Sequence, residues 1–134
     1  MIYKSILCLL VLLLPQYALG DSHAQTVTPF HRDRATVAAQ YNAATLGLDP
    51  SKGLRWQFYW SANNKKNLTE MGAEMKTKRY VVIGEIQRAK GKYRLQLEGL
   101  DILSLDDLIA RSGHFFESAK TSGSVYEGWS VAPL

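Results

Sequence analysis

The end of the chain, residues 104–131, joins a capped helical pattern to an alternating one, and this pairing constrains the fold more than any other segment. Ser104 is a favourable N-cap residue, and Asp107 follows three positions later, as in a capping box. Gly123 is a typical helix stop. The apolar residues between these points recur at helical spacing and form one stripe: Leu105, Leu108, Ile109, Phe116 and Ala119. The segment therefore predicts an amphipathic helix.

Beyond Gly123 the pattern changes to the two-residue period of a strand. Val125, Trp129 and Val131 fall on one side, and the other side carries Ser124, Tyr126, Gly128 and Ser130. Glu127 falls on the apolar side, and an inward charge is tolerated best on an edge strand, where it can reach water. We therefore expect the chain to close with a strand at the edge of a sheet.

The first 20 residues have the features of a secretory signal peptide. Lys4 supplies the positive start, an apolar run extends from Ile6 to Leu14, and small residues precede a cleavage point after Gly20. The run is short for a membrane-spanning helix, so we expect no membrane association after signal removal. Residues 21–32 are expected to form a flexible lead-in to a domain at 33–134. The expected location is the periplasm or the outside of the cell.

The expected mature chain contains no cysteine, because the single cysteine of the sequence is Cys8. Its stability must therefore come from a packed core, which a chain of this length can supply, and not from disulfides. Removal of Lys4 leaves 15 basic and 12 acidic residues, a formal charge of +3. Without a dense Lys/Arg tract, this mild excess does not by itself indicate a nucleic-acid partner.

Two more helices are predicted before the closing unit. Residues 33–46 share an apolar face at helical spacing, formed by Val37, Tyr41 and Ala44. Residues 61–77 predict the second helix, with Ser61 or Asn63 as its N-cap residue. Its buried stripe consists of Leu68, Met71 and Met75.

Three more strands are predicted as well. In residues 53–60, Trp56, Phe58 and Trp60 face one way, so this segment is expected to be the central core strand. Residues 79–88 and 92–98 are expected to form a hairpin around the turn at 89–91. The element order is then a helix followed by β-α-β-β-α-β, which predicts an α+β, ferredoxin-like sandwich with an additional N-terminal helix.

In that sandwich the two long helices cover one face of the sheet. The opposite face presents polar side chains: Arg55, Gln57, Tyr59, Arg94, Gln96, Glu98, Tyr126 and Ser130. We expect the N-terminal helix to lie over part of this open face through Val37 and Tyr41.

Catalytic patterns are missing from the sequence of the expected mature chain. It contains no cysteine nucleophile and no Gly-x-Ser-x-Gly segment. His23, His31 and His114 have no neighbouring pattern that places them beside a base or a metal. Gly91-Lys92 suits a hairpin turn better than a phosphate loop. We therefore expect no enzyme activity, no cofactor and no metal site.

Two motifs resemble the regulator of ribonuclease E activity B (RraB) family. The first is Tyr126-Glu127-Gly128-Trp129, which follows a helix with Leu105, Leu108 and Ala110. The second is the aromatic strand Trp56-Gln57-Phe58-Tyr59-Trp60 before the first long helix. The resemblance extends from about Gly53 to Val131. It implies the ferredoxin-like domain and a protein-binding character. The best-known members are acidic, cytoplasmic inhibitors of ribonuclease E, whereas this chain is expected to be exported and is mildly basic, so we do not extend their target to it.

The leading hypothesis is an exported, non-catalytic module that acts by occupying a partner protein, and an immunity or inhibitor protein is one variant of it. The candidate binding residues are Arg55, Tyr59, Arg94, Tyr126 and Glu127. The alternative is a nucleic-acid-binding module on the open sheet face, in which Tyr59 and Tyr126 stack on bases while Arg55 and Arg94 supply charge. Expected export counts against the alternative. Neither the partner nor the oligomeric state follows from any motif.

Overall fold

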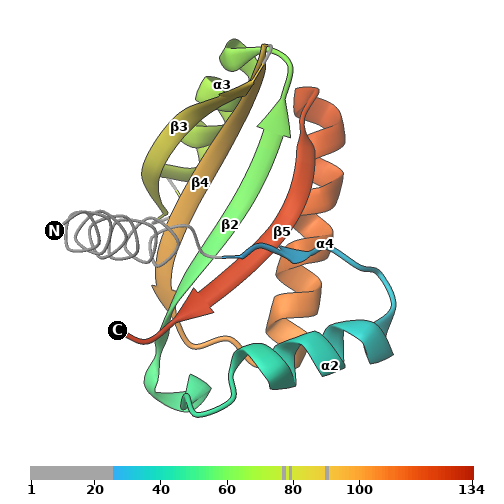
Figure 1. Ribbon diagram of the computed structural model, residues 1–134, viewed down its shortest axis with the longest axis vertical. Coiled ribbons are helices and arrows are strands. Elements are labelled where there is room, and N and C mark those ends of the chain that lie inside the picture. Colours follow the sequence, from blue (N-terminus) through green and yellow to red (C-terminus); the bar gives the residue numbers. More distant parts are fainter. Residues whose placement is uncertain (1–25, 77, 79, 90) are drawn as a thin grey trace, which may run out of the picture.

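The computed structural model describes residues 26–76, 78, 80–89 and 91–134. The expected signal peptide and residues 21–25 of the lead-in lie outside these residues. The helices are α2 (Arg34–Ala44), α3 (Lys65–Lys76) and α4 (Leu105–Ser122), with a short 3-10 turn at Pro50–Lys52 (Figure 1). The strands are β1 (Thr28–Pro29), β2 (Leu54–Ala62), β3 (Val81–Ala89), β4 (Lys92–Asp101) and β5 (Val125–Ala132).

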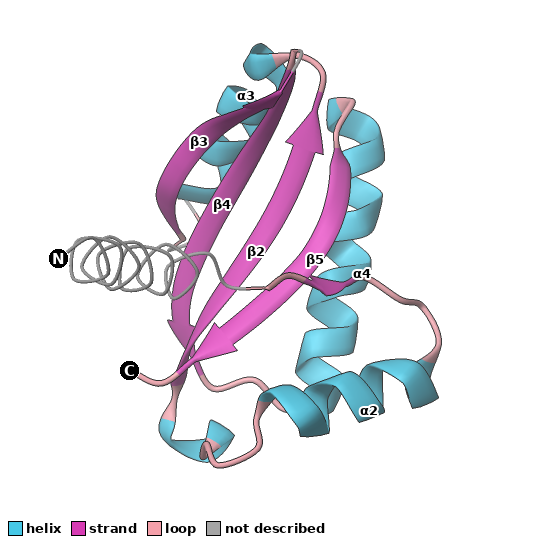
Figure 2. Cartoon of the chain, in the orientation of Figure 1, coloured by secondary structure: helices cyan, strands magenta, loops and turns pink. Residues whose placement is uncertain are grey.

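The strands form one antiparallel sheet in the order β1-β5-β2-β4-β3. Both long helices, α3 and α4, lie behind the sheet in Figure 2, so one face is covered and the other is turned toward the viewer. The path β2-α3-β3-β4-α4-β5 is the predicted β-α-β-β-α-β order, and the ferredoxin-like α+β fold is confirmed. The two-residue strand β1 is an addition that the sequence analysis did not predict.

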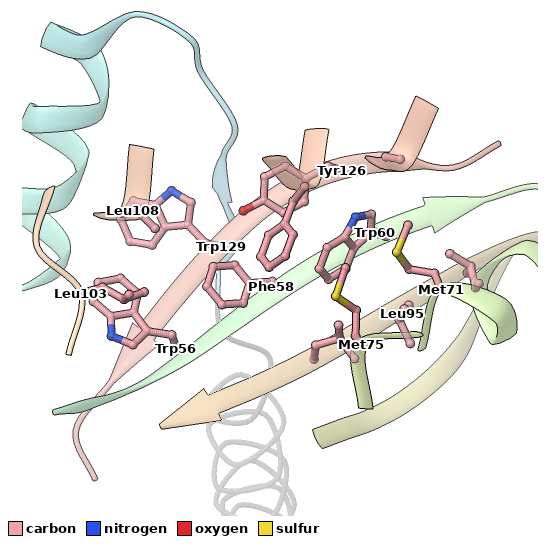
Figure 3. Packing of buried hydrophobic residues seen from close by; sticks show 14 of the residues in the cluster. Trp56, Phe58, Trp60, Met71, Met75, Leu95, Leu103, Leu108, Tyr126 and Trp129 are labelled. Atoms are coloured by element: carbon pink, nitrogen blue, oxygen red, sulfur yellow. The ribbon is translucent and has the colours of Figure 1, made fainter. Parts of the chain in front are cut away.

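The central strand β2 supplies the middle of the core, as its aromatic alternation predicted. Trp56, Phe58 and Trp60 each have 0% of their surface exposed, and Figure 3 shows them in one core with the methionines of α3 and Trp129 of β5. A buried aromatic side chain removes roughly 150–250 Å² from water, which contributes about 4–6 kcal/mol at ~25 cal/mol per Å². These three residues therefore fix which face of β2 carries the helices.

Helix α4 begins with the predicted capping box and ends at the predicted glycine. The Asp107 amide donates to Ser104 Oγ at 3.1 Å, and the Ser104 amide donates to Asp107 Oδ2 at 3.1 Å. Gly123 adopts a left-handed conformation with φ of 71°. The fully buried face differs from the predicted stripe, because it consists of Leu108, Ser112, Phe115 and Ala119. Leu105, Ile109 and Phe116 are partly buried at the margin of the core.

The predicted N-cap of α3 is wrong by one to three residues. The cap is Asn64, whose side-chain oxygen accepts from the Lys66 amide at 2.8 Å. Ser61 cannot take this place because β2 continues to Ala62, where Ser61 and Ala62 pair with Arg94 and Tyr93 of β4. Sheet pairing therefore delays the start of the helix.

The predicted position of the N-terminal helix is also wrong. Helix α2 lies below the end of α4 and extends the helical layer (Figure 1), so it does not cover the open face. Tyr41 stacks on Trp56 with a centroid distance of 6.1 Å, and its hydroxyl donates to the Leu103 carbonyl at 2.7 Å. Val37 joins the core at 5% exposure. The apolar side of α2 packs against the core because the polar sheet face offers it no matching surface.

The phase of β5 differs from the simple alternation. Gly128 pairs with Tyr59 and Tyr126 pairs with Trp60, so Glu127 is an extra residue in a β-bulge. The bulge places Tyr126 on the same face as Trp129, where it is 3% exposed and packs against Trp60 (Figure 3). The predictions that Tyr126 lies on the open face and that Glu127 points inward are therefore wrong.

Candidate functional site

The open face of the sheet carries the polar side chains of three neighbouring strands. Of the predicted binding residues, Arg55 and Tyr59 come from β2, Arg94 from β4 and Glu127 from β5. No helix among the described residues lies over this face in Figure 2. The structure therefore brings four of the five predicted binding residues onto one surface, and Tyr126 is the exception.

Gln57 is the centre of a hydrogen-bond network on this face. Its side-chain oxygen accepts from the Tyr59 hydroxyl at 2.8 Å and from Gln96 Nε2 at 2.9 Å. Its side-chain nitrogen donates to Glu98 Oε1 at 3.0 Å. Ser130 Oγ lies 2.8 Å from the Tyr59 hydroxyl. The network crosses three strands, so it fixes the rotamers of polar groups that would otherwise be free to reorient.

The alternation in the sequence predicted that Gln57 lies on this face, but no sequence pattern identified it as the centre of the network. The register explains its role, because Gln57 lies opposite both Glu98 of β4 and Ser130 of β5. The available signal was a glutamine in the middle of the central strand, because its side-chain amide can both donate and accept hydrogen bonds.

Tyr59 is held inside this network and is not a free aromatic platform. It is 2% exposed, and the Arg94 guanidinium lies over its ring at 4.7 Å from the centroid. Burial raises the pKa of the Tyr59 hydroxyl, so this group stays neutral and keeps its proton for hydrogen bonding. A nucleobase could stack on Tyr59 only after displacing Arg94.

Two ion pairs give the face its charge. Arg94 Nε lies 3.0 Å from Glu127 Oε1, and these side chains are 20% and 24% exposed. Arg55 Nε lies 3.4 Å from Glu98 Oε1, and Arg55 is more open to solvent at 45%. Each cation faces a carboxylate, so these two pairs provide no excess positive charge of the kind that attracts nucleic-acid phosphates.

Tyr126 has a structural position in the core. Its ring contacts Phe115 and Trp60, and its hydroxyl lies 3.2 Å from Ser112 Oγ on α4. Burial raises the pKa of this hydroxyl well above its ordinary value. Tyr126 therefore cannot stack on a base or contact a partner from the open face, and the stacking pair expected for nucleic acid does not exist.

A hollow of about 500 Å³ lies away from the open face, between α4 and the segment that follows α3. Lys78, Tyr80, Arg111, His114 and Phe115 are among its lining residues. Arg111 is engaged there, because its guanidinium lies 2.7 Å from Asp101 Oδ2 and 5.9 Å from the centroid of the Tyr80 ring. His114, which also lines this hollow, is exposed to solvent.

Within the described residues, no group of three or more His, Cys, Asp or Glu side chains is placed to hold a metal ion. None of the described helices combines the length and apolar character needed to cross a bilayer.

The comparison with protein families gives one match that covers most of the domain. The model of a family described as Regulator of ribonuclease activity B (RraB) matches residues 33–131. No curated protein matches the sequence. The matched region begins at the N-cap of α2, ends within β5 and contains every residue of the open face discussed above. Strand β1 and Phe30 precede it.

Proposed function

Because the chain belongs to the RraB family, we propose that it is a non-catalytic regulatory module that acts by binding a partner protein through the open face of its sheet. The family is described as a regulator of ribonuclease activity, so a ribonuclease is the first partner class to test. The observation that carries the proposal is the cross-strand network of Gln57, Tyr59, Arg94 and Glu127 within the matched region.

This network suits recognition because its polar groups are already ordered. A surface whose side chains are fixed before binding loses less conformational entropy in a complex. Arginine and tyrosine are also enriched at the energetically important positions of interfaces. Arg55 is the residue best placed for direct contact, since its side chain is 45% exposed and its bond to Glu98 is the longer of the two ion pairs. The network around Gln57 would then hold the sheet face in shape, while Arg55 at its more exposed rim contacts the partner.

We further propose that the protein acts outside the cytoplasm, in the periplasm or after secretion. The support is the sequence of the first 20 residues, with Lys4, the apolar run and the small residues before Gly20. The partner would then be an exported protein or an incoming toxin, and regulation would take the form of inhibition or immunity. Cell fractionation with N-terminal sequencing tests this step. A chain that keeps its first 20 residues in the cytoplasm would refute it.

The binding surface is tested with charge reversal at its exposed rim. The variant Arg55→Glu places a carboxylate beside that of Glu98 on the open face. The control is Lys66→Glu, which reverses the charge of an exposed residue on α3 that pairs with Glu70. Affinity capture from a periplasmic extract should recover a stoichiometric protein with the wild type and with Lys66→Glu. With Arg55→Glu the affinity for that purified protein should fall at least tenfold, by about 1.4 kcal/mol. Equal affinities would refute the proposed surface.

A competing result would come from single-stranded RNA or DNA. Salt-sensitive retention that Arg55→Glu and Arg94→Ala both abolish would favour the nucleic-acid alternative. The charge balance of the face and the burial of Tyr126 lead us to expect no such retention.

A further inference from the structure

Residues 26–32, here called the strap, add an outer strand to β5. Thr28 pairs with Trp129 and Pro29 pairs with Gly128 in antiparallel register. The Phe30 amide then donates to the Glu127 carbonyl at 3.0 Å. The pairing thus uses the backbone groups that the β5 edge offers at its bulge (Figure 1).

Gly128 makes room for this close approach. Its φ is +147°, and a Cβ atom at this position would lie 1.9 Å from the Thr28 carbonyl oxygen and 3.1 Å from the Phe30 nitrogen. Any other residue would collide with the backbone of the strap. The edge at Gly128 is therefore shaped to receive another extended chain.

The aromatic ring of the strap fills a slot between α4 and β5. Phe30 stacks on Phe116 with a centroid distance of 4.7 Å, and it meets the edge of Tyr126 at 5.5 Å. Arg32 covers the Phe116 ring at 4.6 Å and pairs with Glu117 at 3.3 Å. This explains why Phe116 extends the apolar side of α4 beyond the sheet-facing row. The slot accepts an aromatic residue followed two positions later by a cation.

Apart from the ring contacts of Phe30 and Arg32, few interactions hold the strap in place. The register covers two residue pairs, and Pro29 has no amide proton to donate. The Arg32–Glu117 pair is 66% and 64% exposed, a setting in which ion pairs contribute little. A 3.3 Å bond from Gln40 Nε2 to the Pro29 carbonyl adds a further polar contact within the described part of the chain. The strap can therefore detach without disturbing the buried residues of β2.

The docking edge and the strap also differ in whether they belong to the region that matches the family. Gly128, Phe116 and Tyr126 lie inside the region that matches the family, 33–131, whereas the strap precedes it. A receptor edge that belongs to the family domain is thus filled by a segment from outside that domain.

We propose that the β5 edge, with the slot between Phe116 and Tyr126, is a docking site for an extended segment of a partner protein, and that the strap occupies this site in cis. The partner segment adds a strand, inserts an aromatic residue and places a cation near Glu117. The inference deepens the proposed protein-binding function by adding a second surface, and its test does not use the open face.

The test uses full-length protein and a labelled peptide with the sequence of residues 26–32, Thr-Val-Thr-Pro-Phe-His-Arg. In the wild type the tethered strap competes at a high effective concentration, so the peptide should bind weakly. The variant Phe30→Ala loses the anchor of its own strap, and it should bind the peptide at least tenfold more tightly in fluorescence anisotropy. A peptide with alanine in place of its phenylalanine should show at least tenfold weaker binding to the same variant.

A second variant guards against loss of folding. Arg32→Glu places a carboxylate beside Glu117 and weakens the strap from a position outside the core, where the Arg32 side chain is 66% exposed. This variant should also bind the peptide more tightly than the wild type, by about twofold to fivefold. Circular dichroism checks that both variants fold. Equal peptide affinity in the wild type and both variants would overturn the proposal.

Light scattering tests the alternative that the site is occupied by the strap of a second copy of this chain. A wild-type dimer that becomes monomeric in Phe30→Ala would show that the strap exchanges between two copies of the chain, and this would overturn docking of a partner segment. A monomer in all variants, together with tighter peptide binding, would support it. Failure of peptide binding would leave the open-face proposal intact, because that proposal is tested separately with Arg55→Glu.

Discussion

Two ion pairs of similar length and different burial allow the rigidity of the open face to be measured. Arg94 and Glu127 lie 3.0 Å apart with 20% and 24% of their side chains exposed. Arg34 and Asp106 lie 2.7 Å apart but are 64% and 76% exposed. The first pair crosses the sheet and the second joins α2 to α4 at the surface. The comparison therefore isolates the effect of burial on pairing.

The expected coupling energies follow from this difference. A hydrogen bond to a charged group contributes roughly 1.5–3 kcal/mol when it is shielded from water. Because a fifth to a quarter of the Arg94 and Glu127 side chains is still exposed, we expect about 1–2 kcal/mol for their coupling. Exposed pairs contribute about 0.2–1 kcal/mol, and we expect no more than about 0.5 kcal/mol for Arg34 and Asp106.

The assay is a double-mutant cycle with alanine at each position, read by urea unfolding. The cycle removes the separate contribution of the Arg94 contact with the Tyr59 ring, since that contact is lost in both the single and the double variant. With an m-value of roughly 1–3 kcal/mol per molar urea, a change of 1.5 kcal/mol moves the midpoint by about 0.5–1.5 M.

Coupling energies that agree within about 0.3 kcal/mol would refute the reasoning. The open face would then be no more ordered than an ordinary surface, and it would not be preorganised for binding. A coupling near 1–2 kcal/mol at Arg94–Glu127 alone would support that argument.

Three further predictions concern stability. Gly128→Ala should lower the free energy of unfolding by about 1–3 kcal/mol, because an alanine is strained at a φ of +147°. Gly113→Ala, which has open space in α4, should raise the free energy of unfolding by about 0.5–1 kcal/mol. Urea unfolding measures both. Trp56→Phe removes a 3.2 Å bond from Nε1 to the Asp101 carbonyl, whereas the buried Nε1 of Trp60 has no hydrogen-bond partner among the described residues. Trp56→Phe should therefore cost about 1 kcal/mol more than Trp60→Phe in the same assay, and equal costs would contradict this. Hydrogen bonds from Ser104 lower the pKa of Asp107 in the folded protein below its ordinary value of 3.8. The stability that ionised Asp107 contributes is therefore complete above pH 3.8 and is lost as the pH falls through the lowered pKa of the folded state. Asp107→Asn should lose less stability than the wild type in acid, and parallel pH profiles would contradict this.

Local alternation along the strands was enough to predict most of the open face. The alternation in residues 53–60 placed Arg55, Gln57 and Tyr59 together, because a strand of period two needs no distant information to sort its faces. Arg94 followed from the same rule on β4. The network around Gln57 could not be read in this way, since it depends on which residues of β4 and β5 lie opposite that position.

The sequence by itself determined the order of the elements, the core face of β2 and the capping box of α4. Each of these depends on residues within about four positions of one another, where spacing and capping preferences act. Tertiary structure alone decided the bulge at Glu127 and Gly128, the packing of Tyr41 on Trp56 and the docking of Phe30 on Phe116. These features join segments about 15 to 100 positions apart. The simple alternation fails in β5 because the position of a bulge depends on pairing with β2 and with the strap, which the local sequence does not show.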